Sequence, residues 1–420
     1  MKIPAINATE ETATVKSVSL APLFIICFLG TAFGGAISTL MSVYLPVVVK
    51  DLQVANNPAD LDAISGYINS LFIFGWAIGG FSWGLISDKI GRKAALLLAI
   101  GTYGVFTVLT GLMPNWIGII VCRFMSGFGV GGVLAVSVVL LTEVWPERTR
   151  AVFIGIISIA FPVGIFSAGL INFFVSSWQQ GFFIGIIPVI VAIAGIWTIK
   201  ESEMWLTLRS EQAGALKPSY PLFSGSNLKP LITGSIIFGT MLIGMWALFS
   251  WMPTWIQSLI AVDAPKERGL SMMFLGMGGL TGGFLSGWLV NFIGLRKSLM
   301  ASFAVCALMS FLLFKTNSHF SAIIYAEIAV LALFFGVSQG VLSVYIPLLF
   351  PTSVRASATG FCFNIGRLFT AAAVLFVGVL VNVFGGYSNS LFIFSLVFIL
   401  GLAVVIFIKN IQPGGQSLSN

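Results

Sequence analysis

Long apolar runs separated by short polar connections make up most of this chain. Twelve of them are long enough, or nearly so, to cross a bilayer as a helix, which takes about 17–25 residues. The pattern therefore predicts an all-α integral membrane protein with twelve transmembrane helices. The predicted helices cover residues 19–47, 64–86, 94–113, 116–143, 151–174, 181–199, 230–260, 269–290, 298–314, 321–348, 357–383 and 389–408.

The polar connections predict how these helices are grouped. Residues 200–229 form the longest and most polar connection, so we expect a central cytoplasmic loop between two six-helix bundles, 19–199 and 230–408. Cytoplasmic tails are expected at 1–18 and 409–420. With both termini inside, cytoplasmic segments would hold 15 of the 21 Lys and Arg residues and outer segments four. This bias predicts cytoplasmic termini.

Composition narrows the class of protein further. The chain is 58% hydrophobic and 8% charged, whereas soluble domains carry about 25% charged residues. The net charge of +7 is scattered in short clusters, which argues against a nucleic-acid partner. The first 20 residues are polar and no cleavage pattern follows, so no signal peptide is expected. The four cysteines lie in apolar runs and are expected to be buried thiols. These features predict a multi-pass protein of the cell (inner or plasma) membrane.

Two motifs recur at a nearly constant spacing. Residues 84–93, GLISDKIGRK, follow the second predicted helix, and residues 287–297, GWLVNFIGLRK, follow the eighth. Residues 142–151, TEVWPERTRA, and 348–356, LLFPTSVRA, follow the fourth and the tenth. Offsets of 203 and 205 residues at matching places indicate an internal duplication. Such repeats are typical of secondary transporters, with the substrate site near the midplane between them.

On these residues the chain resembles the major facilitator superfamily over essentially its full length. Residues 84–93 fit that family's loop signature, and Arg123 with the glycines after it resembles the helix 4 motif of many proton-coupled members. Residues 200–206, KESEMWL, resemble a signature of sugar porters and their organic-acid relatives. Residues 364–367, NIGR, are similar to the Gly-Arg of aromatic-acid–proton symporters. The resemblance implies two pseudo-symmetric bundles that rock around a central site.

The chain departs from the family's pattern in places that matter for coupling. Asn291 and Leu348 stand where the first half has Asp88 and Glu143, so the acidic form of each motif is present only in the N-terminal half. The first predicted helix lacks the aspartate typical of aromatic-acid symporters. Uniport and anion exchange therefore stay open beside proton symport.

The resemblance also implies a gate at the loop signature. Asp88, Arg92, Glu143 and Arg150 would bridge neighbouring helices and hold the cytoplasmic side shut in one state. The simpler interpretation of Arg92 is that its charge only sets the topology.

Two arginines, Arg123 and Arg367, lie inside apolar runs. A charge at that depth costs at least about 2.5–3.5 kcal/mol and usually faces a cavity or a partner. A guanidinium is a planar fork suited to a carboxylate, phosphate or sulfonate, so both are candidate substrate ligands. Arg123 could instead pair with backbone carbonyls or with Glu327, which the repeat offset relates to its neighbourhood. Glu327 is the candidate proton-coupling residue, and a permanent structural ion pair explains it equally well.

Further candidates for the substrate site come from polar and aromatic positions in the predicted cavity helices. Trp246 and Trp251 would frame a ring or hydrophobic body, or else anchor the helix at the membrane interface. Asn364, Gln339 and Tyr345 complete the set.

Together these observations predict a secondary active transporter that moves a small organic anion, an aromatic or sugar acid, with protons by alternating access. We expect a monomer surrounded by membrane lipid, with no cofactor and no metal. No nucleophile–base or metal constellation indicates an enzyme. A neutral-sugar porter, a drug or metabolite efflux antiporter and a transport-derived sensor are the alternatives.

Overall fold

The computed structural model describes residues 20–52, 58–211, 223, 225–351 and 354–407. Within these ranges, twelve segments are long and apolar enough to cross a membrane, as predicted. The helices are α1 (Ala21–Asp51), α2 (Pro58–Ile90), α3 (Arg92–Leu112), α4 (Trp116–Val144), α5 (Glu147–Phe174), α6 (Trp178–Phe182), η1 (Phe183–Gly185), α7 (Ile186–Thr198), α8 (Glu203–Glu211), α9 (Gly225–Ser258), α10 (Pro265–Ile293), α11 (Leu295–Phe311), η2 (Leu312–Thr316), α12 (Ile323–Leu348), α13 (Arg355–Leu380), α14 (Tyr387–Ser395) and α15 (Val397–Phe407).

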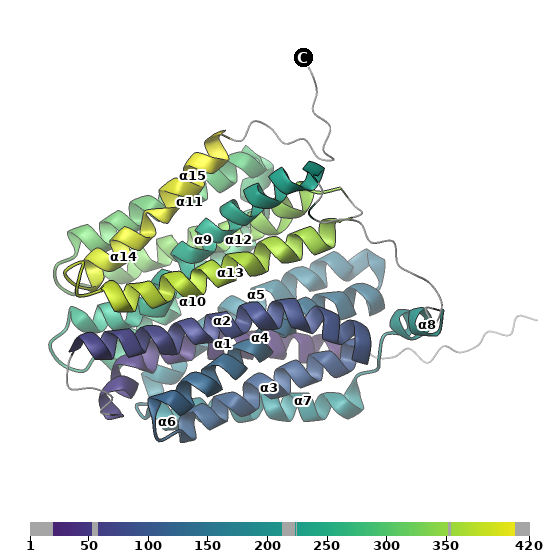
Figure 1. The fold of residues 1–420 in the computed structure, drawn as a ribbon, viewed down its shortest axis with the longest axis horizontal. Helices are drawn as coiled ribbons and strands as arrows, with labels where there is room; N and C mark the ends of the chain where they lie inside the picture. The colour runs from purple at the N-terminus through teal and green to yellow at the C-terminus, as the bar shows by residue number, and fades with distance from the viewer. Residues whose placement is uncertain (1–19, 53–57, 212–222, 224, 352–353, 408–420) are drawn as a thin grey trace, which may run out of the picture.

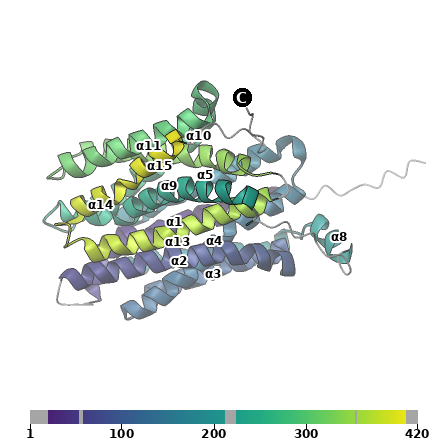
Figure 2. The same cartoon turned by 45° about the horizontal axis from the view of Figure 1, so that its top comes forward.

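The helices form two halves that follow the order of the chain. In Figure 1 the N-terminal half, α1 to α7, lies below the C-terminal half, α9 to α15. In Figure 2, α13 of the C-terminal half runs beside α2 of the N-terminal half. The segment predicted as the loop 200–229 contains helix α8 and the first residues of α9. The predicted tails, 1–18 and 409–420, lie outside the described residues.

Equivalent backbone features confirm the internal duplication. Gly91 and Gly294, 203 residues apart, both have positive φ angles, 105° and 85°, where the chain turns between consecutive spans. Glycine has no Cβ and adopts this left-handed region without strain. Arg150 and Arg355, 205 residues apart, each donate from Nε to the carbonyl five residues earlier, at 3.1 and 3.2 Å. The two offsets are the ones found for the sequence motifs.

Glycines let helices of each half approach backbone to backbone. A Cβ atom on Gly79 of α2 would lie 2.1 Å from the carbonyl oxygen of Phe128 in α4. At the equivalent crossing of α10 and α12, a Cβ on Gly282 would lie 1.8 Å from the carbonyl oxygen of Leu333. Small residues at such crossings are the usual means of close packing between membrane helices.

The two halves touch mainly through α2 with α13 and through α5 with α10. We call the end that carries Gly91 and Gly294 the motif side and the opposite end the far side. On the far side, Asp62 of α2 accepts hydrogen bonds from the Tyr387 hydroxyl and, at 3.4 Å, from Asn382 Nδ2 of the other half. These contacts hold the far side closed.

Contact between α5 and α10 weakens step by step toward the motif side. A Cβ atom on Gly276 would lie 2.4 Å from the backbone nitrogen of Phe166. On Gly279 and Gly283 the nearest atoms would be side-chain carbons at 3.8 and 3.9 Å, and on Gly287 no atom lies within 4 Å. The helices therefore diverge along their length.

The same divergence appears at the four helices that make the main contacts between the halves. Gly84 of α2, Gly155 of α5, Gly287 of α10 and Gly360 of α13 all face open space. The first and third are 203 residues apart and the second and fourth 205, so they are equivalent positions of the two repeats. The structure is therefore closed on the far side and open between the halves on the motif side.

Candidate functional site

Arg123 lies in the middle of the N-terminal half on α4 and is only 1% exposed. Its Nη1 donates to the carbonyl oxygen of Ile37 in α1 at 3.1 Å. The guanidinium carbon lies 4.0 Å from the ring centroid of Phe72 in α2, a cation–π geometry. Its Nε has no hydrogen-bond partner. A backbone carbonyl and an aromatic face thus hold this cation.

Arg367 projects from α13 toward the N-terminal half. Its Nη1 donates to Asn364 Oδ1, one turn earlier, at 2.9 Å. The guanidinium carbon lies 5.0 Å from the ring of Trp76 in α2, and Nε has no partner. Among the described residues no ion pair involves Arg367 or Arg123.

Aromatic side chains connect the two arginines across the interface between the halves. Phe72 and Trp76 contact each other edge to face at 6.1 Å, and Trp76 meets Trp246 of α9 at 5.1 Å. Phe161 of α5 packs on Trp76 at 5.5 Å. We call Phe72, Trp76, Phe161 and Trp246 the aromatic bridge. Of this set only Trp246 was predicted from the sequence, because an aromatic residue in an apolar helix carries no signal of the direction of its side chain.

The structure does not bring Arg123 and Glu327 together, which corrects the predicted approach of these two charges. Glu327, near the far-side end of α12, accepts instead from Asn317 Nδ2 at 2.7 Å. No ion pair within the described ranges includes Glu327. The repeat offset related Glu327 to the position next to Arg123 by symmetry, and symmetry-related positions need not be in contact. Its role in proton coupling stays a prediction.

The remaining predicted substrate ligands differ in burial and in whether they have a free hydrogen-bonding group. Trp251 is fully buried, and its indole N–H donates to the carbonyl of Val374 at 3.1 Å, which favours a packing role. Gln339 is half-buried, and its Nε2 has no partner. Tyr345 is half-buried nearer the motif side, against the apolar core. Of these residues, Gln339 alone leaves a buried donor available for a substrate.

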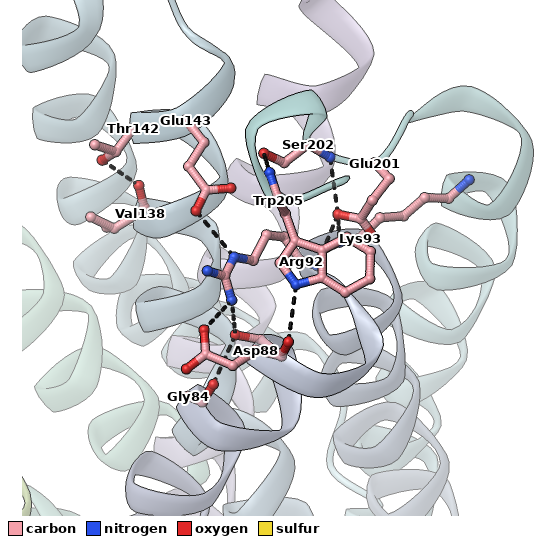
Figure 3. Close-up of polar contacts among 11 residues, drawn as sticks. Gly84, Asp88, Arg92, Lys93, Val138, Thr142, Glu143, Glu201, Ser202 and Trp205 are labelled. Atoms are coloured by element: carbon pink, nitrogen blue, oxygen red, sulfur yellow. Dashed lines mark hydrogen bonds and ion pairs between the residues drawn. The ribbon is translucent and has the colours of Figure 1, made fainter. Parts of the chain in front are cut away.

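Three of the four predicted gate residues form a connected cluster on the motif side (Figure 3). Arg92 lies between Asp88, at 2.6 Å, and Glu143, at 3.1 Å, and so links the end of α2 and the start of α3 to the end of α4. Arg150 lies apart and donates to the carbonyl of Trp145. All these contacts lie within the N-terminal half. A gating role for the four residues stays a prediction.

Glu201, which was not among the predicted gate residues, binds the backbone of this cluster at the start of α3. Its Oε1 accepts from the backbone N–H groups of Arg92, Lys93 and Ser202 at 2.8, 3.0 and 3.0 Å. Trp205 of α8 donates its indole N–H to the carbonyl of Asp88 at 3.0 Å. The KESEMWL motif was the available signal, because it contains both residues. Its physical role is to cap the N-terminus of α3 and to fasten α8 to it.

Glu201→Ala is expected to destabilise the motif side. The change leaves three backbone N–H groups without their acceptor, and loss of a helix cap costs about 0.5–2 kcal/mol. Faster hydrogen exchange at the start of α3 and a lower unfolding temperature of the purified protein would reveal it. Glu203→Ala, two residues away on an exposed side chain, is the matched control. Equal behaviour of the two variants would show that the cap is energetically unimportant.

Comparison with known proteins agrees with this architecture. Residues 24–365 match the family model described as Major Facilitator Superfamily. The cis,cis-muconate transport protein of Acinetobacter baylyi is 26% identical over 97% of this chain and 99% of its own length. The niacin transporter NiaP of the same organism is 25% identical over 93% of this chain and 94% of its own.

Solved structures share the fold. The crystal structure of a D-xylose–proton symporter matches with a TM-score of 0.76 at 15% identity, over 95% of this chain and all of that one. The family model covers most of the chain and the helices have the expected two-half arrangement. This chain therefore belongs to the Major Facilitator Superfamily and is a multi-pass membrane transporter, not an enzyme.

Proposed function

We propose that this protein transports a small organic carboxylate whose negative charge is held by Arg367. The observation that carries the proposal is a pair of cations in membrane-spanning helices, Arg123 and Arg367, with no carboxylate partner in the part of the chain that the structure describes. A charge in such surroundings is costly unless a counter-charge meets it. A substrate anion supplies that counter-charge.

Arg367 is better suited than Arg123 to receive the anion. Arg123 is almost completely buried, and Ile37 and Phe72 already contact it. Arg367 is half-buried, and Asn364 orients one of its terminal nitrogens while Nε stays free. A guanidinium held in this way can donate two hydrogen bonds to one carboxylate. We therefore assign the primary contact to Arg367 and a supporting electrostatic role to Arg123.

The aromatic bridge favours a substrate with a planar conjugated body. Trp76 lies beside Arg367 and Trp246 packs edge to face on Trp76, and aromatic surfaces bind other π-systems well. Two relatives are named as transporters of cis,cis-muconate and of niacin, and both compounds carry a carboxylate next to conjugated double bonds. The site thus offers one cationic group for the acid and an aromatic wall for its body.

A neutral-sugar porter fits these contacts less well. A sugar requires several free polar groups that converge on its hydroxyls. Asn364 uses both ends of its amide, with Arg367 and with the carbonyl of Gly360, and Trp251 donates to Val374. Efflux of hydrophobic cations is disfavoured by the two buried arginines.

We further propose that the motif side is cytoplasmic and that the structure represents the inward-open state. The Lys and Arg bias of the sequence supports the orientation, and open space at four symmetry-related glycines supports the state. Proton coupling is part of the proposal, and the matching D-xylose–proton symporter supports it as a precedent in this fold. In this scheme the protein acts as a monomer in the lipid bilayer.

Nicotinate uptake is the first test of this function. Purified protein in liposomes with an inward proton gradient is expected to accumulate radiolabelled nicotinate or cis,cis-muconate and to exchange it in counterflow. Nicotinamide is the matched control, because it has the same ring and size without the charge, and it should not compete. Competition by nicotinamide equal to that by nicotinate, or uptake of D-xylose alone, would contradict the anion proposal.

A further inference from the structure

We propose that Arg268 and Asn172 form a second carboxylate-binding site on the far side, where the transported anion first meets the protein. The inference rests on the proposed function, because it assigns an additional binding step to the same substrate. It concerns the seam between α5 of the N-terminal half and α10 of the C-terminal half. The Lys and Arg bias places Arg268 among the outer cations, and such residues are usually solvated.

Arg268 is instead buried, with 1% of its surface exposed. Its Nη1 donates to Asp263 Oδ1 at 2.5 Å and to the Oε1 of Gln257. Its Nε is buried without a hydrogen-bond partner. The Asp263 side chain is 64% exposed, so one carboxylate separates this cation from the far-side solvent. One donor of the guanidinium is thus left unused beneath the surface.

Asn172, near the far-side end of α5, is also 1% exposed. Its amide makes no hydrogen bond of good geometry, although it lies against the Tyr44 hydroxyl. A buried amide without partners costs about 1–3 kcal/mol, and such a group in a folded protein calls for an explanation. A ligand that accepts a hydrogen bond from Nδ2 provides one.

The two residues lie at the same crossing of α5 and α10, because a Cβ atom on Gly269, the neighbour of Arg268, would lie 3.2 Å from the backbone nitrogen of Phe173, the neighbour of Asn172. Gly164 marks the face of α5 that packs on α1, and Gly169 marks the face that packs against Gly269 of α10. Around the axis of α5, Asn172 lies between these two faces. Arg268 immediately precedes Gly269. The hydroxyl of Tyr44 in α1 is a shared neighbour, because Asn172 lies beside it and Arg268 is within electrostatic range of it. Both residues therefore lie where α1, α5 and α10 meet.

The Asp263 side chain indicates which chemical group this site accepts. It is a carboxylate, it belongs to the chain, and it occupies Arg268 in this far-side-closed structure. A substrate carboxylate can take its place when the far side opens, accepting from Arg268 and from Asn172 Nδ2. Because these donors come from different halves, a bound carboxylate would also draw the far side together as the substrate moves inward.

Initial rates of nicotinate uptake in proteoliposomes test the site through three variants. Arg268→Gln and Asn172→Leu are expected to raise KM by about tenfold or more, since each removes a hydrogen bond to a charged group, with a smaller effect on kcat. Asp263→Asn is expected to leave KM unchanged or to lower it, because it removes the competing carboxylate. Asn172→Leu should also raise the unfolding temperature, since it removes an unpaired buried amide.

The outcomes separate a binding site from a structural ion pair. If Arg268 only stabilises the fold through Asp263, Asp263→Asn will impair uptake as Arg268→Gln does, and the proposal is overturned. Unchanged KM in Asn172→Leu would also overturn it. Wild-type protein that takes up neither nicotinate nor cis,cis-muconate would instead contradict the proposed function, whereas normal wild-type uptake with unaffected variants would contradict only the second site.

Discussion

Arg367→Gln is expected to reduce kcat/KM for nicotinate uptake by about 30-fold to several thousandfold. Glutamine keeps a polar side chain of similar reach but loses the charge and the two-pronged donor geometry. Truncating one partner of a buried, hydrogen-bonded charge pair costs about 2–5 kcal/mol, and each 1.4 kcal/mol is tenfold. Initial uptake rates over a range of nicotinate concentrations measure the effect. The change should appear mainly in KM if Arg367 holds the anion throughout the cycle.

The conservative variant and a remote charge make this result specific. Arg367→Lys keeps the charge without the planar fork and should recover part of the activity. Lys50→Gln removes one positive charge at the exposed far-side end of α1 and should leave uptake unchanged. If Arg367→Gln transports nicotinate as fast as the wild type does, Arg367 serves helix packing and the anion site lies elsewhere.

The architecture could be predicted from the sequence because the signals for it are local and repeated. Length and continuity of the apolar runs predicted all twelve spans, and the recurring motifs predicted equivalent positions that the structure confirms at Gly91 and Gly294. The unusual cost of a charge in a membrane singled out Arg123 and Arg367 without any structure. Burial of all four cysteines as free thiols is likewise confirmed. Each of these inferences required only the sequence of one helix or the comparison of two similar sequence motifs.

Contacts between distant helices could not be predicted in the same way. Which face of α2 meets α13 decides that Trp76 lies beside Arg367, and twelve largely apolar helices offer little periodicity from which to read that face. The repeat offset related Glu327 to the surroundings of Arg123, but the acid bonds Asn317. No signal in the sequence indicated that Gln257 and Asp263 fold over Arg268. Each miss concerns the direction of one side chain.

The gate cluster shows how the two halves can share a fold and differ in chemistry. In the N-terminal half, Asp88, Glu143 and Glu201 surround Arg92. By the 203-residue offset, Leu295 takes the place of Arg92 in the C-terminal half. Arg296 corresponds to Lys93, and both donate at 2.7 Å to a carbonyl oxygen near the end of the last spanning helix of their half, that of Ile406 and that of Ile196. The two halves thus share the bond to a helix carbonyl, whereas the arginine that Asp88 and Glu143 contact is present only in the N-terminal half. An ion-pair cluster can be rearranged by charge or solvation, so we expect the latch to lie in the N-terminal half.

Gly282→Ala is expected to prevent normal packing of the C-terminal half. Any Cβ at this position of α10 would lie 1.8 Å from the carbonyl oxygen of Leu333, a backbone atom that cannot rotate away. The two helices must separate, and overpacking of this kind costs about 1–3 kcal/mol or more. We expect a lower unfolding temperature and a lower yield of monodisperse protein. Size-exclusion chromatography and thermal unfolding in detergent measure both.

Gly287→Ala on the same helix is the matched control for this substitution. No atom lies within 4 Å of its added Cβ, and alanine is about 0.5–1 kcal/mol better than glycine within a helix. The control should therefore unfold at the same temperature as the wild type or higher. Gly79→Ala in the N-terminal half, where the Cβ would meet the Phe128 carbonyl at 2.1 Å, should repeat the defect of Gly282→Ala. Tolerance of alanine at Gly282 together with loss of stability at Gly287 would refute the view that paired glycine crossings, inherited from the duplication, hold each half together as the halves rock.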